Sequence, residues 1–271
     1  MKPARPRKPS TPDSTTQRGR ASTPRPLPEP PTAPLAPTPE FLAATAEYGI
    51  EFEPGDVDRL GWFLAMLLRV NEAFNLTSIT DPALAWMKHI FDSLTLMPLL
   101  AELPEGSRVV DVGSGGGLPG VPLAIVMPHL RFSLLEATGK KAAFLRDVVQ
   151  RLSLANVDVI EDRAERVGRH HRDAKSRRES FDAVVARAVG RLAVVAELTV
   201  PLCSVGGRVL LIKGEQAMAE VEESARALRL LRIDVAGIVQ TPTGSIIVID
   251  KSQPTPHGYP RSDGEPKKSP L

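Results

Sequence analysis

A run of glycines after an apolar segment is the feature of this sequence best suited to bind a ligand. Val109, Val110 and Val112 are typical of a buried strand, and the run Gly113-Ser-Gly-Gly-Gly117 follows them directly. Glycines cost conformational entropy on folding, so this run predicts positive φ angles and a close approach of backbone to ligand. An apolar helix is expected from about Leu118, which places the loop at the carboxyl end of a strand in an α/β sheet.

Two ligand-binding patterns fit this segment. The spacing Gly115-x-Gly117-x-x-Gly120, with Glu136 ending the next apolar strand, is that of a dinucleotide site in which an acid binds the ribose. The pattern strand-Asp-x-Gly-x-Gly-x-Gly, beginning at Asp111, resembles motif I of the class I S-adenosylmethionine (SAM) methyltransferases. A carboxylate at the lip of the site would suit the ammonium and sulfonium groups of SAM better than a pyrophosphate. Asp111 therefore favours SAM over NAD, with a plain glycine-rich turn as the third interpretation.

Composition limits the classes of protein that remain. With 271 residues, 42% of them hydrophobic, the chain can hold one large domain or two small ones. No apolar run approaches the roughly 18 residues of a membrane span and no hydrophobic signal segment begins the chain, so we expect a soluble cytoplasmic protein. Cys203 is the only cysteine and the five histidines are scattered, so we expect neither a disulfide nor a metal site.

Both ends of the chain differ in composition from its middle. Residues 1–39 carry twelve prolines and seven basic against two acidic residues, and residues 252–271 are rich in Pro, Lys and Ser. We expect the first segment to be disordered or in polyproline II conformation and the second to be disordered. The first would act as a solubilising extension or weakly attract phosphates. The remainder, residues 40–251, has 24 basic and 28 acidic residues, so any affinity for nucleic acid must come from local patches.

Residues 40–103 are expected to form a helical N-terminal region. Asp81-Pro82 has the form of an N-cap and a first-turn proline, which predicts one helix running to about Ala101. Within it, four polar residues share one face of an otherwise apolar segment, namely Lys88, His89, Asp92 and Ser93. They could form an internal hydrogen-bonded cluster, or they could face a substrate.

Residues 104–251 are expected to form the ligand-binding domain. Strands ending near Val112, Glu136, Ile160, Arg187 and Lys213 alternate with helices, and a closing hairpin turns at residues 241–244. This pattern predicts a Rossmann-like α/β fold with a seven-stranded, mostly parallel sheet. A basic loop, residues 166–178, contains no aromatic residue, so it suits phosphate contact better than base stacking, although a solvated charged loop is the commoner explanation.

Seven motifs in order resemble the glucose-inhibited division protein B family, bacterial SAM-dependent methyltransferases that modify N7 of one guanine in 16S ribosomal RNA. The motifs lie between residues 40 and 250 and comprise Asn75-Leu-Thr77, His89 with Asp92-Ser-Leu94, Asp111-Val-Gly-Ser-Gly-x-Gly-Leu-Pro-Gly120, Gly139-Lys-Lys with Phe144-Leu145, Arg163-Ala-Glu165, Ala186-Arg-Ala188 and Lys213-Gly214. The resemblance implies SAM as cofactor, the small ribosomal subunit as partner and a class I SAM-dependent methyltransferase fold. We expect a monomer.

The resemblance also implies roles for individual residues. Gly113 and Leu118 would line the methionine end of SAM, and Gly115 and Gly117 would let the backbone approach it. Glu136 would bind the ribose hydroxyls, Ala164 and Glu165 would frame the adenine, and Arg187 would face cofactor and incoming base. His89 would contact the RNA.

Guanine N7 has a free lone pair and needs no general base, so orientation would supply most of the rate. We hypothesise that Arg187 and Lys213 orient the guanosine through O6 or phosphate; for Arg187 the alternative is an ion pair with Asp111 or Glu136. Three other functions stay open on the sequence alone. They are SAM-dependent methylation of a protein or small molecule, NAD(P)-linked oxidoreduction, and RNA binding during ribosome assembly without turnover.

Overall fold

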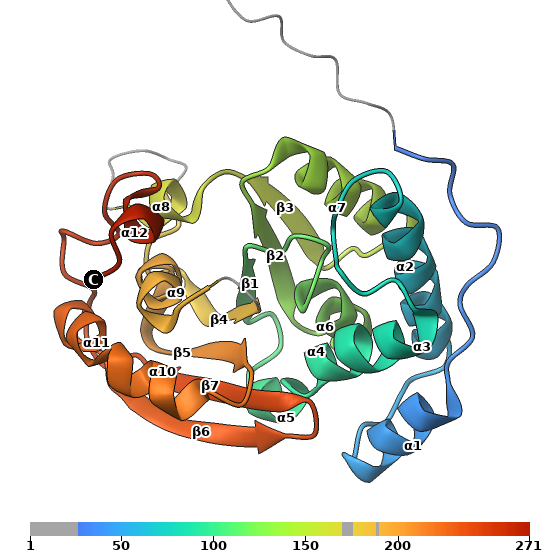
Figure 1. Cartoon of the computed structure of the whole chain (residues 1–271), viewed down its shortest axis with the longest axis horizontal. Coiled ribbons are helices and arrows are strands. Elements are labelled where there is room, and N and C mark those ends of the chain that lie inside the picture. The colour runs from blue at the N-terminus through green and yellow to red at the C-terminus, as the bar shows by residue number, and fades with distance from the viewer. Residues whose placement is uncertain (1–26, 170–175, 188–189) are drawn as a thin grey trace, which may run out of the picture.

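The structure is a computed structural model and describes residues 27–169, 176–187 and 190–271. Within these ranges the centre is a seven-stranded sheet in the order β3-β2-β1-β4-β5-β7-β6 (Figure 1). The strands are β1 (Arg108–Val112), β2 (Arg131–Glu136), β3 (Val157–Glu161), β4 (Phe181–Arg187), β5 (Cys203–Lys213), β6 (Val235–Thr241) and β7 (Gly244–Asp250). The first five pair in parallel, and β7 pairs antiparallel with both β5 and β6. The predicted fold class is confirmed.

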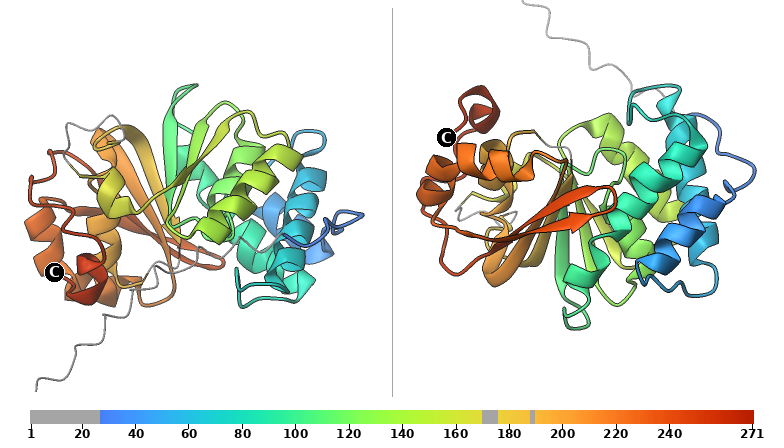
Figure 2. Two further views of the ribbon diagram at one scale, coloured as in Figure 1. Left: turned by 90° about the horizontal axis from the view of Figure 1, so that it is seen from above. Right: turned by 60° about the horizontal axis from the view of Figure 1, so that its bottom comes forward.

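Helices cover both faces of the sheet. On the N-terminal side the chain forms α1 (Pro39–Glu47), α2 (Asp56–Asn71), α3 (Pro82–Ala85), η1 (Trp86–Phe91), α4 (Asp92–Leu94) and α5 (Met97–Leu100). Further along the chain come α6 (Gly120–Val126), α7 (Gly139–Arg151), α8 (Ala164–Val167), α9 (Leu192–Thr199), α10 (Ala217–Glu223), α11 (Ala225–Leu231) and α12 (Glu265–Lys268). Figure 2 shows the N-terminal helices on one side of the sheet and α9 to α11 on the other.

The single helix predicted from Asp81 is interrupted. Asp81 is its N-cap, because the Asp81 carboxylate accepts a hydrogen bond of 2.8 Å from the Leu84 amide. The helix then widens to π geometry over η1 and returns to α geometry in α4. Such π-turns recur at functional sites, and this one carries Lys88 and His89.

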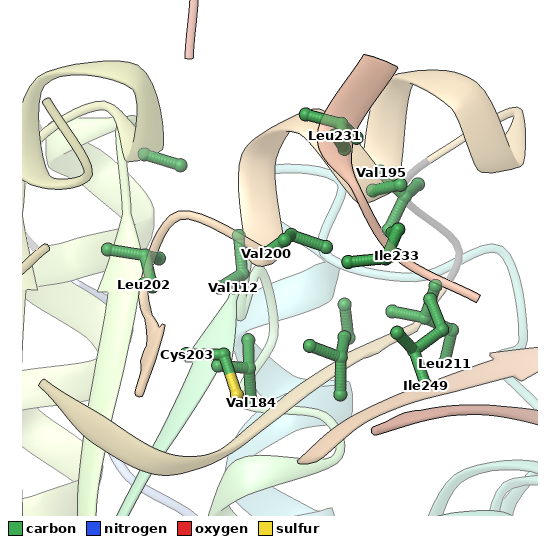
Figure 3. Close-up of a cluster of buried hydrophobic side chains, with 14 of the residues drawn as sticks. Val112, Val184, Val195, Val200, Leu202, Cys203, Leu211, Leu231, Ile233 and Ile249 are labelled. Carbon is green, nitrogen blue, oxygen red and sulfur yellow. The ribbon is translucent and has the colours of Figure 1, made fainter. Parts of the chain in front are cut away.

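The central strands are apolar along their length because both faces are covered. One large cluster of buried side chains packs between the sheet and α9, and Figure 3 shows Val112, Val184 and Val195 among them. Cys203 belongs to the same cluster, and its burial raises the pKa of the thiol to about 12. A thiol held protonated in this way cannot act as a nucleophile at neutral pH.

Part of the segment predicted to be disordered at the N-terminus is packed. The Leu35 amide donates a hydrogen bond of 3.2 Å to the Gly61 carbonyl of α2. A side chain at Gly61 would lie only 2.4 Å from the Leu35 carbonyl oxygen, so this glycine permits the contact. The prediction of disorder is therefore wrong for residues 27–39, of which Pro39 already begins α1, and residues 1–26 lie outside the described part of the chain.

The prediction that residues 252–271 are disordered is also wrong. The Arg261 guanidinium forms two hydrogen bonds, of 2.8 and 2.6 Å, with the carboxylate of Glu197 in α9, whose side chain is fully buried. At the start of the segment, the buried Lys251 ammonium donates to Glu179 and to two backbone carbonyls. Polar contacts hold this segment, and the side chains of Tyr259 and Leu271 pack against the large cluster of buried side chains. Such scattered contacts form no periodic pattern in the sequence.

Arginines of the basic loop bind the C-terminal segment. Arg166 and Arg169 both pair with Asp263, and Arg178 donates to the carbonyls of Tyr259 and Thr255. These arginine side chains therefore bind other parts of the protein, which leaves them less available to phosphate. Residues 170–175 of the same loop lie outside the described residues.

No helix in the described part of the chain is long and apolar enough to span a membrane.

Candidate active site

Two adjoining cavities lie at the carboxyl ends of the central strands. The larger, of about 780 Å³, is bounded by the glycine loop, by η1 and α4, and by the ends of β4 and β5. The smaller, of about 530 Å³, is bounded by the ends of β1 and β2, by α8 and by the C-terminal segment. Gly113 lines both cavities, so an elongated ligand could reach from one into the other.

The glycine loop has the positive φ angles predicted for it. Gly113 has a φ of 74° and Gly115 a φ of 56°, both in the left-handed region that favours glycine. The Gly113 amide donates a hydrogen bond of 2.8 Å to the Leu135 carbonyl, which ties the loop to the neighbouring strand. Gly115 and Leu118 line the larger cavity, and only a backbone oxygen lies within 4 Å of where a Gly115 side chain would begin. This part of the loop is open to a ligand.

Gly117 does not share this position. A Cβ atom at Gly117 would lie 2.8 Å from the Val121 side chain and 3.2 Å from the Phe63 ring, and Gly117 lines neither cavity. Its amide donates within the loop, to the Ser114 carbonyl at 2.7 Å. The expected role in cofactor approach is therefore corrected to one in packing the loop against α2 and α6.

Asp111 lies beneath the glycine loop and not at its lip, where the sequence suggested it. The residue is fully buried, and one carboxylate oxygen accepts a hydrogen bond of 3.0 Å from the Gly120 amide at the start of α6. The other oxygen has no hydrogen-bond partner within the described residues. Burial raises the pKa of Asp111 to about 7. Because Asp111 lines neither cavity, its carboxylate does not face the site where the ammonium and sulfonium groups of SAM would bind.

The raised pKa of Asp111 predicts a pH effect on stability. In the unfolded chain the carboxyl releases its proton near pH 3.8, whereas the folded protein retains it up to about pH 7. Folding therefore loses stability as the pH rises through this window. We expect Asp111→Asn to remove that loss, so that the stability of the variant relative to wild type rises between pH 4.5 and pH 8 in urea unfolding. A difference that is the same at both pH values would contradict the assignment.

Glu136 ends β2 with its carboxylate held rigidly. One oxygen accepts from the Gly115 amide at 3.0 Å and the other from the Thr138 amide at 2.7 Å. Glu136 lines the smaller cavity and is only 7% exposed. Each oxygen keeps a second lone pair, so the carboxylate can accept two further hydrogen bonds from a ligand such as a ribose.

Ala164 and Glu165 lie at the far side of the smaller cavity. Both line it, but one oxygen of the buried Glu165 carboxylate accepts a hydrogen bond of 2.7 Å from the Gly264 amide. Pro266 and Lys267 of the C-terminal segment line the same cavity. The segment that the sequence led us to exclude from the fold therefore forms one wall of this site.

Arg187 ends β4 and crosses the larger cavity to the N-terminal helices. Its Nη1 donates to the Lys88 carbonyl at 2.7 Å and to the Asp92 carboxylate at 3.1 Å, and its Nη2 lies 3.3 Å from His89 Nδ1. The side chain is 14% exposed. Arg187 does form an ion pair, as the alternative interpretation of the sequence supposed, but its partner is Asp92 and not Asp111 or Glu136. Two of the five guanidinium hydrogens remain available to a ligand.

His89 lines the same cavity but carries no charge near neutral pH. Burial and the adjacent Arg187 lower the pKa of His89 to about 4. Its Nε2 lies 2.7 Å from the Thr77 hydroxyl. The polar face predicted in this helix combines both interpretations: Ser93 donates to the His89 carbonyl inside the helix, whereas Lys88, His89 and Asp92 border the cavity.

Lys213 ends β5 with its charge already neutralised. Its ammonium forms an ion pair of 2.7 Å with Glu220 and donates to the Gly190 carbonyl. Glu220 in turn accepts from the Leu192 amide at 3.0 Å, so Lys213 anchors the start of α9. Lys213 lines the larger cavity, as expected, but its ammonium is less available to an RNA than the sequence suggested.

Two lysines that were not singled out for this role suit phosphate better. Lys88 and Lys141 line the larger cavity, and within the described chain neither ammonium forms an ion pair. Lys88 is exposed, and Lys141 is half-buried at the start of α7. Lys141 falls in the Gly139-Lys-Lys motif, which is the only signal in the sequence that could have indicated it.

The described residues include no group of three or more metal-ligating side chains.

Comparison with known proteins agrees with this geometry. The sequence model of the GidB family, described as rRNA small subunit methyltransferase G, matches residues 56–245. A protein of that name from Sorangium cellulosum is 48% identical over 87% of this chain and 96% of its own. Another, from Leuconostoc citreum, is 37% identical over 85% of this chain and 98% of its own.

Solved structures share the fold. Cofactor-bound Rv0187 from MTB matches with a TM-score of 0.50 and 20% identity, over 82% of this chain and all of the other. At such low identity this match shows the fold alone. The family follows from the sequence matches, which extend over most of both chains, and the chain belongs to the GidB family, the rRNA small subunit methyltransferases G.

Proposed function

We propose that this protein transfers the methyl group of SAM to N7 of a guanine in small-subunit ribosomal RNA. The observation that carries the proposal is the junction at Gly113 of two cavities, one containing the buried Glu136 carboxylate and one bordered by Arg187. The relatives matched above are named as methyltransferases of this RNA. The proposal places the enzyme where ribosomal subunits are made, in the cytoplasm.

The residues at the junction fit SAM. The smaller cavity offers the Glu136 carboxylate to two hydroxyls, with apolar side chains from Val112 and Leu135 beside it. Gly113, Gly115 and Leu118 would then line the methionine end in the larger cavity. Bound SAM supplies an electrophilic methyl group on a sulfonium.

Glu136→Gln should weaken SAM binding about tenfold or more, because a charge-assisted hydrogen bond of about 1.5–3 kcal/mol is lost. The amide would also direct N–H groups at one of the two backbone amides that now hold the carboxylate. Titration calorimetry with SAM measures the change. Glu161→Gln is the matched control, because Glu161 ends the neighbouring strand opposite Glu136 and lines neither cavity. Equal affinity of both variants would contradict the role of Glu136.

The larger cavity supports methylation of a nitrogen that needs no base. Its two carboxylates are both occupied, Asp92 by Arg187 and Glu220 by Lys213. His89 is neutral, and its ring nitrogens contact Arg187 and Thr77. These groups are arranged to hold a base in position. Guanine N7 attacks through its own lone pair, so positioning it in line with the methyl group is what the site must supply.

The partner is the small ribosomal subunit, bound by a monomer. Lys88 and Lys141 would contact phosphate at the mouth of the larger cavity, and the target guanine must be unpaired to enter it. Among the described residues each exposed large apolar side chain comes from a different element, so no single helix or strand presents an apolar face to a second copy, which supports a monomer. Because residues 40–251 are mildly acidic, assembled or partly assembled subunits should be better substrates than naked RNA.

The experiment incubates the protein with radiolabelled SAM and small subunits from cells that lack it. We expect label in the RNA, with faster transfer to subunits than to naked 16S RNA. Label found only in ribosomal protein, or in a small molecule of the extract, would overturn the proposed substrate while retaining the cofactor. Equal rates on naked RNA and subunits would contradict the preference for subunits alone.

A further inference from the structure

Thr77 lies on the wall of the larger cavity in a fixed orientation. It belongs to the loop between α2 and α3, where the Asn71 side-chain oxygen accepts hydrogen bonds from the Leu76 and Thr77 amides at 2.7 and 2.9 Å. Leu118 and Arg187 line the same cavity. The Thr77 side chain is only partly buried, so a ligand in the cavity can reach it.

The contact between Arg187 and His89 determines where the histidine carries its proton. A guanidinium can only donate, so the contact of 3.3 Å between Arg187 Nη2 and His89 Nδ1 requires the histidine tautomer in which Nδ1 accepts. A neutral imidazole has one N–H, and it must then be on Nε2. The low pKa of His89 agrees with a neutral ring.

The same reasoning continues to Thr77. In this tautomer His89 Nε2 donates to the Thr77 hydroxyl oxygen at 2.7 Å, and the Ile79 amide donates to the same oxygen at 3.0 Å. A hydroxyl oxygen has two lone pairs, and both are occupied. Its remaining hydrogen has no acceptor within the residues that the structure describes. Toward a ligand, Thr77 is therefore a donor only.

We propose that the Thr77 hydroxyl donates a hydrogen bond to O6 of the target guanine and thereby selects guanine over adenine. The inference rests on the proposed function. The reactive edge of guanine carries two acceptors, O6 and N7, whereas adenine carries an amino group in place of O6. A hydroxyl that can only donate can form a hydrogen bond with O6 of guanine, whereas at the same position of adenine it would face an N–H of the amino group.

Thr77 also leaves N7 free to react. An arginine that contacts guanine with two hydrogens covers both O6 and N7 and would block methylation. A single hydroxyl hydrogen binds O6 alone. Arg187 acts through His89 on this contact, because its guanidinium fixes which ring nitrogen carries the proton. In this respect Arg187 is a positioning residue for Thr77.

The test is a double-mutant cycle in which the Thr77 hydroxyl and guanine O6 are removed separately and together. Wild type and Thr77→Val are given subunits whose RNA carries guanine or 2-aminopurine at the methylated position, and kcat/KM is measured for each pair. 2-Aminopurine lacks O6. Its altered N7 reactivity affects both enzymes equally, so it cancels when the two enzymes are compared on the same base. We expect kcat/KM of Thr77→Val to be about tenfold below that of wild type on guanine. On 2-aminopurine, which has no O6 to contact, the two enzymes should have the same kcat/KM.

Two other variants separate recognition from folding. Thr77→Ser keeps the hydroxyl and should recover most of the rate on guanine. Thr80→Val makes the same substitution three residues away, at an exposed position that lines neither cavity, and should behave as wild type. SAM affinity should be unchanged in all three variants.

Equal losses by Thr77→Val on guanine and 2-aminopurine, or no loss on either, would overturn the assignment to O6. Failure of Thr77→Ser to recover activity would overturn it too. If wild type transferred no methyl group to the unmodified RNA, the proposed function would fail, and the inference with it.

Discussion

Arg187→Ala is expected to lower methyl transfer to small subunits by about a hundredfold, with SAM affinity falling much less. The guanidinium joins β4 to η1 and α4 across the larger cavity and fixes the protonation of His89. Its loss leaves Asp92 with Thr243 as its remaining partner and disorders the wall that holds the base. A factor of one hundred corresponds to about 2.7 kcal/mol of activation free energy, which is modest for a positioning interaction.

Single-turnover rates and SAM titrations separate the two effects of this substitution. Arg187→Lys keeps the charge but cannot span three acceptors in fixed directions, so it should recover only part of the rate. The thermal midpoint of each variant shows whether it is folded. Full turnover together with full SAM affinity in Arg187→Ala would show that the residue serves neither substrate nor cofactor.

Arg261→Ala should destabilise the protein by about 3–5 kcal/mol, the usual cost of leaving a buried charge without its partner. Glu197 has a fully buried side chain, and both of its oxygens depend on Arg261, which also donates through its backbone amide. The loss should also release the C-terminal segment from the smaller cavity, so SAM affinity should fall with stability. Equilibrium urea unfolding and calorimetry measure the two quantities.

Arg208→Ala is the matched control for this experiment. Arg208 pairs with Asp250 at 2.8 Å, but both side chains are more than a third exposed. Exposed pairs contribute at most about 1 kcal/mol, so the control should be nearly neutral. Similar small losses in both variants would show that the C-terminal segment is not held by the Arg261–Glu197 pair.

The glycine loop and the sheet could be predicted because they depend on local patterns. Buried parallel strands are short apolar runs, and a loop with positive φ angles requires glycine, so both are visible without knowledge of the fold. Glu136 followed as the acid that ends the next strand. Asp111 and Gly117 were misplaced because spacing along a loop does not show which residues face the core.

The wall of the larger cavity could not be predicted in the same way. Arg187 and His89 are 98 residues apart in sequence, and Lys213 reaches Glu220 only because a turn brings α10 back to β5. The ordered C-terminal segment could not be predicted because its anchors are ion pairs, single hydrogen bonds and two isolated apolar side chains, Tyr259 and Leu271, which have no period in the sequence. Partners of charged side chains are set by tertiary structure, whereas apolar periodicity reports only burial.

The most direct test of the account is the identity of the nucleoside that the enzyme methylates. Small subunits from cells lacking the protein are treated with the enzyme and SAM, and the 16S RNA is digested to nucleosides and analysed by mass spectrometry. We expect 7-methylguanosine to rise by one residue per subunit, with no other methylated nucleoside changed. Methylation at an exocyclic amine, at a pyrimidine carbon or of protein would contradict the account of a site that orients N7 without a base.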